Sequence, residues 1–248
     1  MATEEQINEA VTEENAADTK ETKEEKKRFL SDSKIELITA IFLGLTALMT
    51  AWATWIGSLH GGNQATNYAR SNNLAAEANA EYNVAAQLYF SDLLSWNTLL
   101  DYQFDKQIGE AKDDKVSVEQ IEQKLDTYAE QNCSDILNNA IDKMTDDMTS
   151  PFEVEGVVES YFDKYNELIE QSNEALEQGR KDNANGDSFN LVTVIYSLVL
   201  FLLGIVGIFK NIPNRAFILG VSIVGVLLTT IFMFTIPMPT DFDFFSYF

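Results

Sequence analysis

Three long stretches of the sequence consist mainly of apolar residues and contain no charged side chain. They cover residues 37–59, 188–209 and 216–240. About 20 apolar residues in an α-helix cross the roughly 30 Å hydrocarbon core of a bilayer. Each stretch therefore predicts a transmembrane helix, because uncharged runs of this length are unusual in soluble proteins.

The region after the first stretch keeps a helical spacing of its larger side chains. They recur every three or four residues, which is the period of a helix, and no proline lies between Ile35 and Ser150. We therefore expect one helix from Ile35 to about Ile108, with a bend or a close helix contact at Gly61 and Gly62. Two glycines inside a helix cost roughly 2 kcal/mol, which a packed helix tolerates. The recurring residues are Ala75, Ala78, Tyr82, Ala85, Tyr89, Leu93, Trp96, Leu100, Phe104 and Ile108.

Two further helices are expected before the second apolar stretch. Ser117, with Gln120 three residues later, has the spacing of a helix N-cap, and Ser150 followed by Pro151 predicts the start of another helix. The glycine- and asparagine-rich residues 179–187 predict the end of that helix. The sequence thus predicts a helical hairpin or small bundle.

The distribution of charged residues predicts how the chain is oriented in a membrane. The sequence has 17 basic and 39 acidic residues and a net charge of -22, so the apolar stretches are joined to strongly acidic segments. Basic residues gather before the first stretch and in the loop between the second and third, and such residues mark the cytoplasmic side of a membrane. We expect a cytoplasmic N-terminus and an extracytoplasmic region 60–187. Residues 1–34 are rich in Glu and Lys and predict a disordered or frayed cytoplasmic segment.

The predicted fold class is an all-α membrane protein. It has three transmembrane helices, with a helical extracytoplasmic domain inserted between the first and the second. The predicted segments are the cytoplasmic residues 1–34, transmembrane helix 35–59, outer domain 60–187, transmembrane helix 188–209, cytoplasmic loop 210–215, transmembrane helix 216–240 and outer tail 241–248.

A motif near the first span resembles a known pattern. In it, an aromatic-rich span is followed by a Gly-x-Gln-Ala step, an Ala/Glu-rich helix, an Asp and a Trp. The chain resembles an uncharacterised prokaryotic family of three-span membrane proteins, which implies location in the plasma (inner) membrane of a prokaryote and no established activity. Acidic residues replace the basic ones expected in the Ala-rich helix. The matching residues are Trp52, Trp55, Gly62, Gln64, Ala65, Tyr68, Ala69, Ala76, Glu77, Ala78, Asp92 and Trp96.

The first span has more small and hydroxyl residues than one intramolecular contact needs. Helices in lipid associate where small residues permit close approach, so these positions predict helix packing, either among the three spans of one chain or between subunits of a homo-oligomer. An adjacent set of threonines, Thr39, Thr46 and Thr50, supports an alternative in which the first span lines the pore of an oligomeric ion channel. The packing stripe consists of Ala40, Gly44, Ala47, Ala51, Thr54 and Ser58.

The sequence offers little catalytic chemistry. His60 is the only histidine and Cys133 the only cysteine, so one chain cannot form a His/Cys metal set or a Cys–His relay. His60 is interpreted as an interfacial polar residue in preference to a pH switch, and Cys133 as a free thiol or one half of an intersubunit disulfide. We expect no enzyme activity, no cofactor and no metal, and the acidic charge argues against nucleic acid.

The functional hypothesis is an oligomeric membrane scaffold. It lies in the lipid bilayer, forms a homo-oligomer and binds a partner protein through its outer helices. The ion channel is the alternative, and the sequence leaves open the oligomer number, the partner and any ion.

Overall fold

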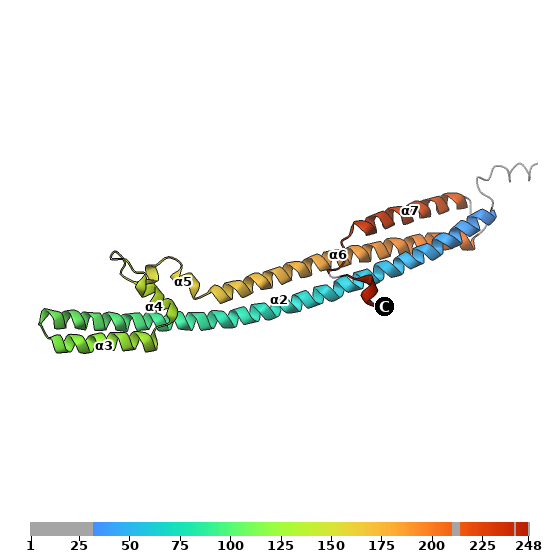
Figure 1. The fold of residues 1–248 in the computed structure, drawn as a ribbon. Helices are drawn as coiled ribbons and strands as arrows, with labels where there is room; N and C mark the ends of the chain where they lie inside the picture. Colours follow the sequence, from blue (N-terminus) through green and yellow to red (C-terminus); the bar gives the residue numbers. More distant parts are fainter. Residues whose placement is uncertain (1–31, 210–213, 241, 248) are drawn as a thin grey trace, which may run out of the picture. The chain divides into compact units, whose positions relative to one another are not determined.

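The computed structural model describes residues 32–209, 214–240 and 242–247, and this part of the chain is all helical (Figure 1). The prediction for residues 1–34 therefore lies almost entirely outside the described residues. The elements are α2 (Asp32–Ala111), α3 (Lys115–Asn132), α4 (Asp135–Asp142), η1 (Pro151–Glu153), α5 (Val157–Ser160), α6 (Asp163–Ile208), α7 (Arg215–Thr235) and η2 (Phe244–Tyr247).

The chain divides into two compact units. The span unit comprises Met1–Gln64 and Arg180–Phe248, and the middle unit comprises Ala65–Gly179. Three helices, α2, α6 and α7, are long and apolar enough to cross a membrane. The chain therefore has the three candidate spans that the hydrophobic pattern predicted.

α2 is a single helix of 80 residues. It passes through Gly61 and Gly62 without a break, and Gly156 is the only glycine with positive φ among the described residues. The predicted continuous helix is thus present. It ends three residues after Ile108.

α6 corrects the prediction that residues 179–187 end a helix, because it runs unbroken for 46 residues. Gly179 allows close packing instead, whereas Gly186 lies at ordinary contact distance from its neighbour. A Cβ added at Gly179 would lie 2.5 Å from the Tyr68 ring, and one at Gly186 would lie 3.5 Å from Cβ of His60. Glycine composition alone does not distinguish a helix end from a close contact.

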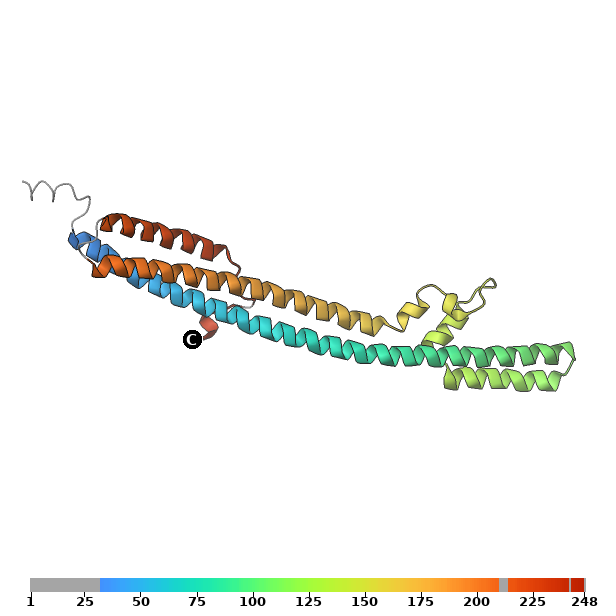
Figure 2. The same ribbon diagram turned by 180° about the vertical axis from the view of Figure 1, so that it is seen from behind.

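The core of the span unit lies between α2, α6 and α7. Ile56 of α2, Phe189 and Leu203 of α6, and Leu219 and Val226 of α7 are all buried there. Both views of the ribbon show α7 beside α6 in this unit (Figures 1 and 2). The hydroxyls of Tyr196 and Thr230 share a hydrogen bond of 2.7 Å, so α6 and α7 are joined by a polar contact within an apolar core.

In the middle unit, α3 folds back along the end of α2 (Figures 1 and 2). Asp113 takes a positive φ of 56° in the turn between them. The predicted N-cap, Ser117, is wrong: Asp114 caps α3, and Ser117 donates its backbone N–H and its hydroxyl to that carboxylate. The pairing of Lys106 with Glu122 at 2.7 Å joins the two helices.

The remainder of the middle unit consists of short helices. Ser134 caps α4, and Ser150 caps the three-residue helix η1, which has Pro151 at its start. The helix start predicted at Ser150 is therefore present, but this helix is only three residues long. The long helix α6 begins at Asp163. Asp92 contacts the chain between α3 and α4, as described next.

Candidate functional site

A buried carboxylate organises the middle unit. Asp92, on α2, is fully buried and accepts hydrogen bonds from the backbone N–H and the hydroxyl of Ser134. It also accepts a 2.6 Å hydrogen bond from the hydroxyl of Tyr161. A buried carboxylate needs such donors because its desolvation is costly. Asp92 therefore fixes the start of α4 and the end of α5 against α2.

The same carboxylate changes the acidity of its neighbours. Burial, and then the hydrogen bond to Asp92, raise the pKa of Tyr161 well above its usual value. Burial raises the pKa of Cys133, and the negative charge of Asp92 adds to the effect. Cys133 is the single cysteine of the sequence, and it is a half-buried free thiol. Its raised pKa makes it a weak nucleophile near neutral pH.

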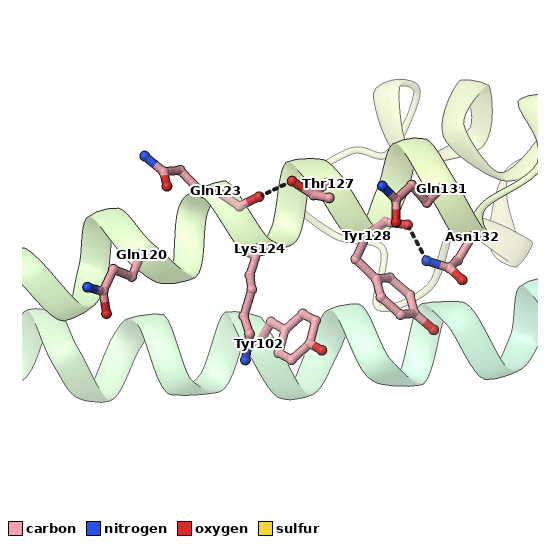
Figure 3. Close-up of a pocket in the computed structure, with 8 residues that line it drawn as sticks. All are labelled: Tyr102, Gln120, Gln123, Lys124, Thr127, Tyr128, Gln131 and Asn132. Atoms are coloured by element: carbon pink, nitrogen blue, oxygen red, sulfur yellow. Dashed lines mark hydrogen bonds between the residues drawn. The ribbon is translucent and has the colours of Figure 1, made fainter.

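A shallow groove of about 380 Å³ lies between α2 and α3. Figure 3 shows the Lys124 side chain extending from α3 towards Tyr102 of α2, and its Nζ lies 5.2 Å from the centroid of that ring. The rings of Tyr102 and Tyr128 meet edge to face at 5.7 Å. The lining is rich in amides and hydroxyls, which suit hydrogen bonding to another polar chain. It consists of Tyr102, Gln120, Gln123, Lys124, Thr127, Tyr128, Gln131 and Asn132.

An apolar row lies uncovered on the α2 segment of the middle unit. It consists of Phe90, Leu94, Phe104 and Ile108, whose exposed fractions are 62, 69, 61 and 51%. Leu94, Phe104 and Ile108 follow Phe90 by 4, 14 and 18 residues, which at about 3.6 residues per turn places all four within about 40° of one helix face. The exposed Asn97 and Asp101 lie on the same face between the two apolar pairs. Exposed apolar patches of this kind mark interaction sites.

In the span unit, the small-residue stripe predicted for packing is also uncovered. All six of its members are exposed in the protomer: Ala40, Gly44, Ala47, Ala51, Thr54 and Ser58. The buried face of α2 in this unit carries other residues, among them Ala53 and Ile56. The stripe therefore takes no part in the intramolecular core.

The threonines of the channel hypothesis have a different environment. Thr39 and Thr46 are buried within the span unit, while Thr50 is half-buried. The hydroxyls of Thr46 and Thr50 donate to the carbonyls of Phe42 and Thr46 in their own helix. Gly61 and Gly62 are exposed, and a Cβ added at either would meet no atom within 4 Å.

The sequence did not reveal the environment of His60. This side chain is only 1% exposed, and its Nδ1 lies 2.9 Å from Oδ1 of Asp182, which is equally buried. Its Nε2 lies 3.1 Å from the carbonyl oxygen of Pro237, and its ring stacks on Phe189. His60 thus joins α2, α6 and the chain after α7, and its interpretation as an interfacial polar residue stays a prediction.

Arg215 is the first residue of α7, and its side chain is buried. Its Nε donates to the carbonyl of Val206 at 2.8 Å, and its Nη1 lies 3.6 Å from Oδ1 of Asp32. Neither Nη atom has a hydrogen-bond partner in the described part of the chain. Arg215 holds α7 against α6 and the start of α2.

The site chemistry and the comparisons do not identify a reaction. No group of three His, Cys, Asp or Glu side chains that could hold a metal ion occurs within residues 32–209, 214–240 and 242–247. These features define an all-helical protein with three candidate membrane spans. Comparison with protein-family models, curated proteins and solved structures gives no match.

Proposed function

We propose that the chain is a non-enzymatic membrane scaffold that self-associates through α2 and binds partner proteins with the helices of its middle unit. It resides in the plasma membrane of a prokaryote, with its N-terminus in the cytoplasm and the middle unit outside. The apolar row on α2 is the observation that carries this proposal. Its four side chains, Phe90, Leu94, Phe104 and Ile108, are each at least half exposed.

A second copy of the chain is the occupant that fits α2 best. α2 presents two kinds of uncovered surface, the small-residue stripe in the span unit and the apolar row in the middle unit. Another α2 offers both kinds. Small residues allow close approach in lipid, while apolar side chains associate in water.

The magnitudes can be compared for the row by itself. Burying a Phe or Leu side chain fully contributes about 1.5–3 kcal/mol, and the members of the row are already partly covered. Association itself costs about 4–15 kcal/mol. Both copies of a dimer contribute a row, so the gain is of the same order as the cost and favours a weak, concentration-dependent contact.

The test uses the full chain in a mild detergent. Phe90→Gln combined with Leu94→Gln should shift the native mass towards the monomer, since two large apolar contacts are lost at each interface. Val84→Gln is the matched control, because Val84 is 60% exposed on the same helix but lies off the row. A wild-type chain that is monomeric by native mass measurement would refute self-association.

The ion channel remains the second hypothesis. A pore lined by Thr39 and Thr46 requires both side chains to leave the interior of the span unit, where they are buried. Among the hydroxyls of the first span, Thr54 and Ser58 are exposed. Conductance measured in planar bilayers would distinguish the two hypotheses.

A further inference from the structure

Both ring nitrogens of His60 face hydrogen-bond acceptors. The carbonyl oxygen of Pro237, 3.1 Å from Nε2, can only accept, and so can an ionised Asp182, 2.9 Å from Nδ1. A neutral imidazole has one N–H and cannot donate to both. For both ring nitrogens to donate, the His60–Asp182 pair must hold one more proton than a neutral imidazole and an ionised carboxylate hold together.

Burial favours the same additional proton. His60 and Asp182 are each 1% exposed, and a charge in such a position is costly unless it is paired. An imidazolium next to a carboxylate has no net charge, whereas the pair without the proton is negative. Hydrogen bonds between charged groups are also the stronger ones.

We propose that His60 is an imidazolium that latches the segment after α7 onto α2, and that loss of its proton to water opens the latch. The remaining ring proton then stays on Nδ1, where the Asp182 carboxylate is the stronger acceptor. The Nε2 lone pair is left facing the lone pairs of the Pro237 carbonyl. The contact to Pro237 opens and the contact to Asp182 persists, so the latch is closed at low pH and open at high pH.

The latched segment makes further contacts with α2. Beyond Pro237, the ring of Phe242 lies 6.3 Å from that of Trp52 and 5.8 Å from that of Trp55. The ring of Phe244 lies 5.8 and 6.1 Å from the same two rings. Loss of the His60–Pro237 contact therefore removes the first attachment of this segment to α2, and its later residues Phe242 and Phe244 keep their ring contacts with that helix.

The other charged residues nearest to His60 and Asp182 along the three packed elements lie on α6 and after α7. α2 has no charged residue between Glu36 and Arg70. On α6 the nearest charged neighbours of Asp182 in sequence are Arg180, Lys181 and Asp187. After α7, Asp241 and Asp243 are the acidic residues of the tail. Asp182 is the carboxylate in contact with the ring, at 2.9 Å.

The single histidine makes a direct measurement feasible. The full chain in lipid vesicles is labelled with ¹⁵N at histidine and ¹³C at the proline carbonyls, and solid-state NMR measures ring protonation and the Nε2–carbonyl distance. The chain has one histidine and four prolines, so one imidazole is observed. At low pH, both ring nitrogens should carry protons and Nε2 should lie beside one proline carbonyl. At high pH, Nε2 should lose its proton and the short distance.

An Asp182→Asn variant isolates the role of the proton. Its amide can donate to Nδ1 of a neutral ring that keeps its N–H on Nε2, so the contact to Pro237 should persist from low to high pH. A neutral ring in the wild type at low pH, with the short distance present, would overturn the proposal. So would a wild-type distance that does not change while the ring loses a proton. Both readouts come from the wild type and do not depend on folding of the variant.

Discussion

The hydroxyl of Tyr161 donates to the buried carboxylate of Asp92 across 69 residues of sequence, at a distance of 2.6 Å. Ser134 supplies two further donors to the same carboxylate. One acidic side chain thus holds together three parts of the middle unit.

Removing this carboxylate should destabilise the middle unit. Asp92→Ala leaves three donors without their acceptor, and each buried unsatisfied group costs about 1–3 kcal/mol. We expect a loss of at least about 3 kcal/mol in the free energy of unfolding, measured by denaturant titration. Asp101→Ala, at an exposed site on the same helix, should change it by less than about 0.5 kcal/mol. Equal effects of the two changes would contradict the assigned role of Asp92.

The raised pKa of Tyr161 predicts a dependence of stability on alkaline pH. Burial and the hydrogen bond to Asp92 raise this pKa above the ordinary value of 10.0. The unfolded chain therefore loses the tyrosine proton first, and the contribution of Tyr161 to stability is complete below about pH 10 and declines above it. Tyr161→Phe should give a shallower fall in melting temperature above that pH. Parallel curves for the two proteins would contradict this prediction.

Alanine should be tolerated at the two glycines near the middle of α2. Gly61→Ala and Gly62→Ala have space for the added Cβ, and each should stabilise by about 0.4–1 kcal/mol through the unfolded chain. Gly179→Ala is the opposite case, since its Cβ would lie 2.5 Å from the Tyr68 ring. Thermal unfolding should therefore give a higher melting temperature for Gly61→Ala and Gly62→Ala, and a lower one for Gly179→Ala. Destabilisation at Gly61 or Gly62 would indicate a close contact with another chain at that point.

Larger side chains on the exposed stripe should affect assembly and leave the protomer intact. Ala47→Leu and Ala51→Leu enlarge side chains that are exposed in the protomer. Overpacking a close helix contact costs about 1–3 kcal/mol, so the native mass in mild detergent should fall. Leu48→Ala, at a side chain that is 71% exposed beside the stripe, should have the milder effect. An unchanged mass for both leucine variants would exclude the stripe from the interface.

The predicted orientation can be tested with single cysteines in a Cys133→Ser background. Asp146→Cys and Ser33→Cys both introduce thiols at exposed positions. An impermeant maleimide added to intact cells should label the thiol at position 146 and leave that at 33 unlabelled, because the basic residues mark the N-terminal side as cytoplasmic. Labelling at 33 alone would reverse the orientation.

The pattern of apolar residues predicted the long helices, but it did not predict the contacts between distant parts of the chain. The helical period and the absence of proline were sufficient for α2, whose 80 residues include both glycines. The break between α3 and α4 was not predicted, since it depends on Ser134 bonding to Asp92, 42 residues away. A local window contains no information on such a pair.

The environment of His60 was missed for a related reason. Asp182 is 122 residues distant in sequence and lies in a polar segment that was expected to end a helix. It becomes a partner of His60 because α6 continues through this segment as one helix from Asp163 to Ile208. The small stripe on the first span follows from local spacing alone, and its role in contacts between subunits stays a prediction.

The distribution of tryptophan makes the two units spectroscopically separable. Trp96 is buried in the middle unit, at 7% exposure, whereas Trp52 and Trp55 lie in the span unit against Phe242 and Phe244. A chain that retains only Trp96 would emit from the middle unit, and one that retains only the other two would emit from the span unit. Intrinsic fluorescence of these two variants would show whether the halves of the molecule melt together or in sequence.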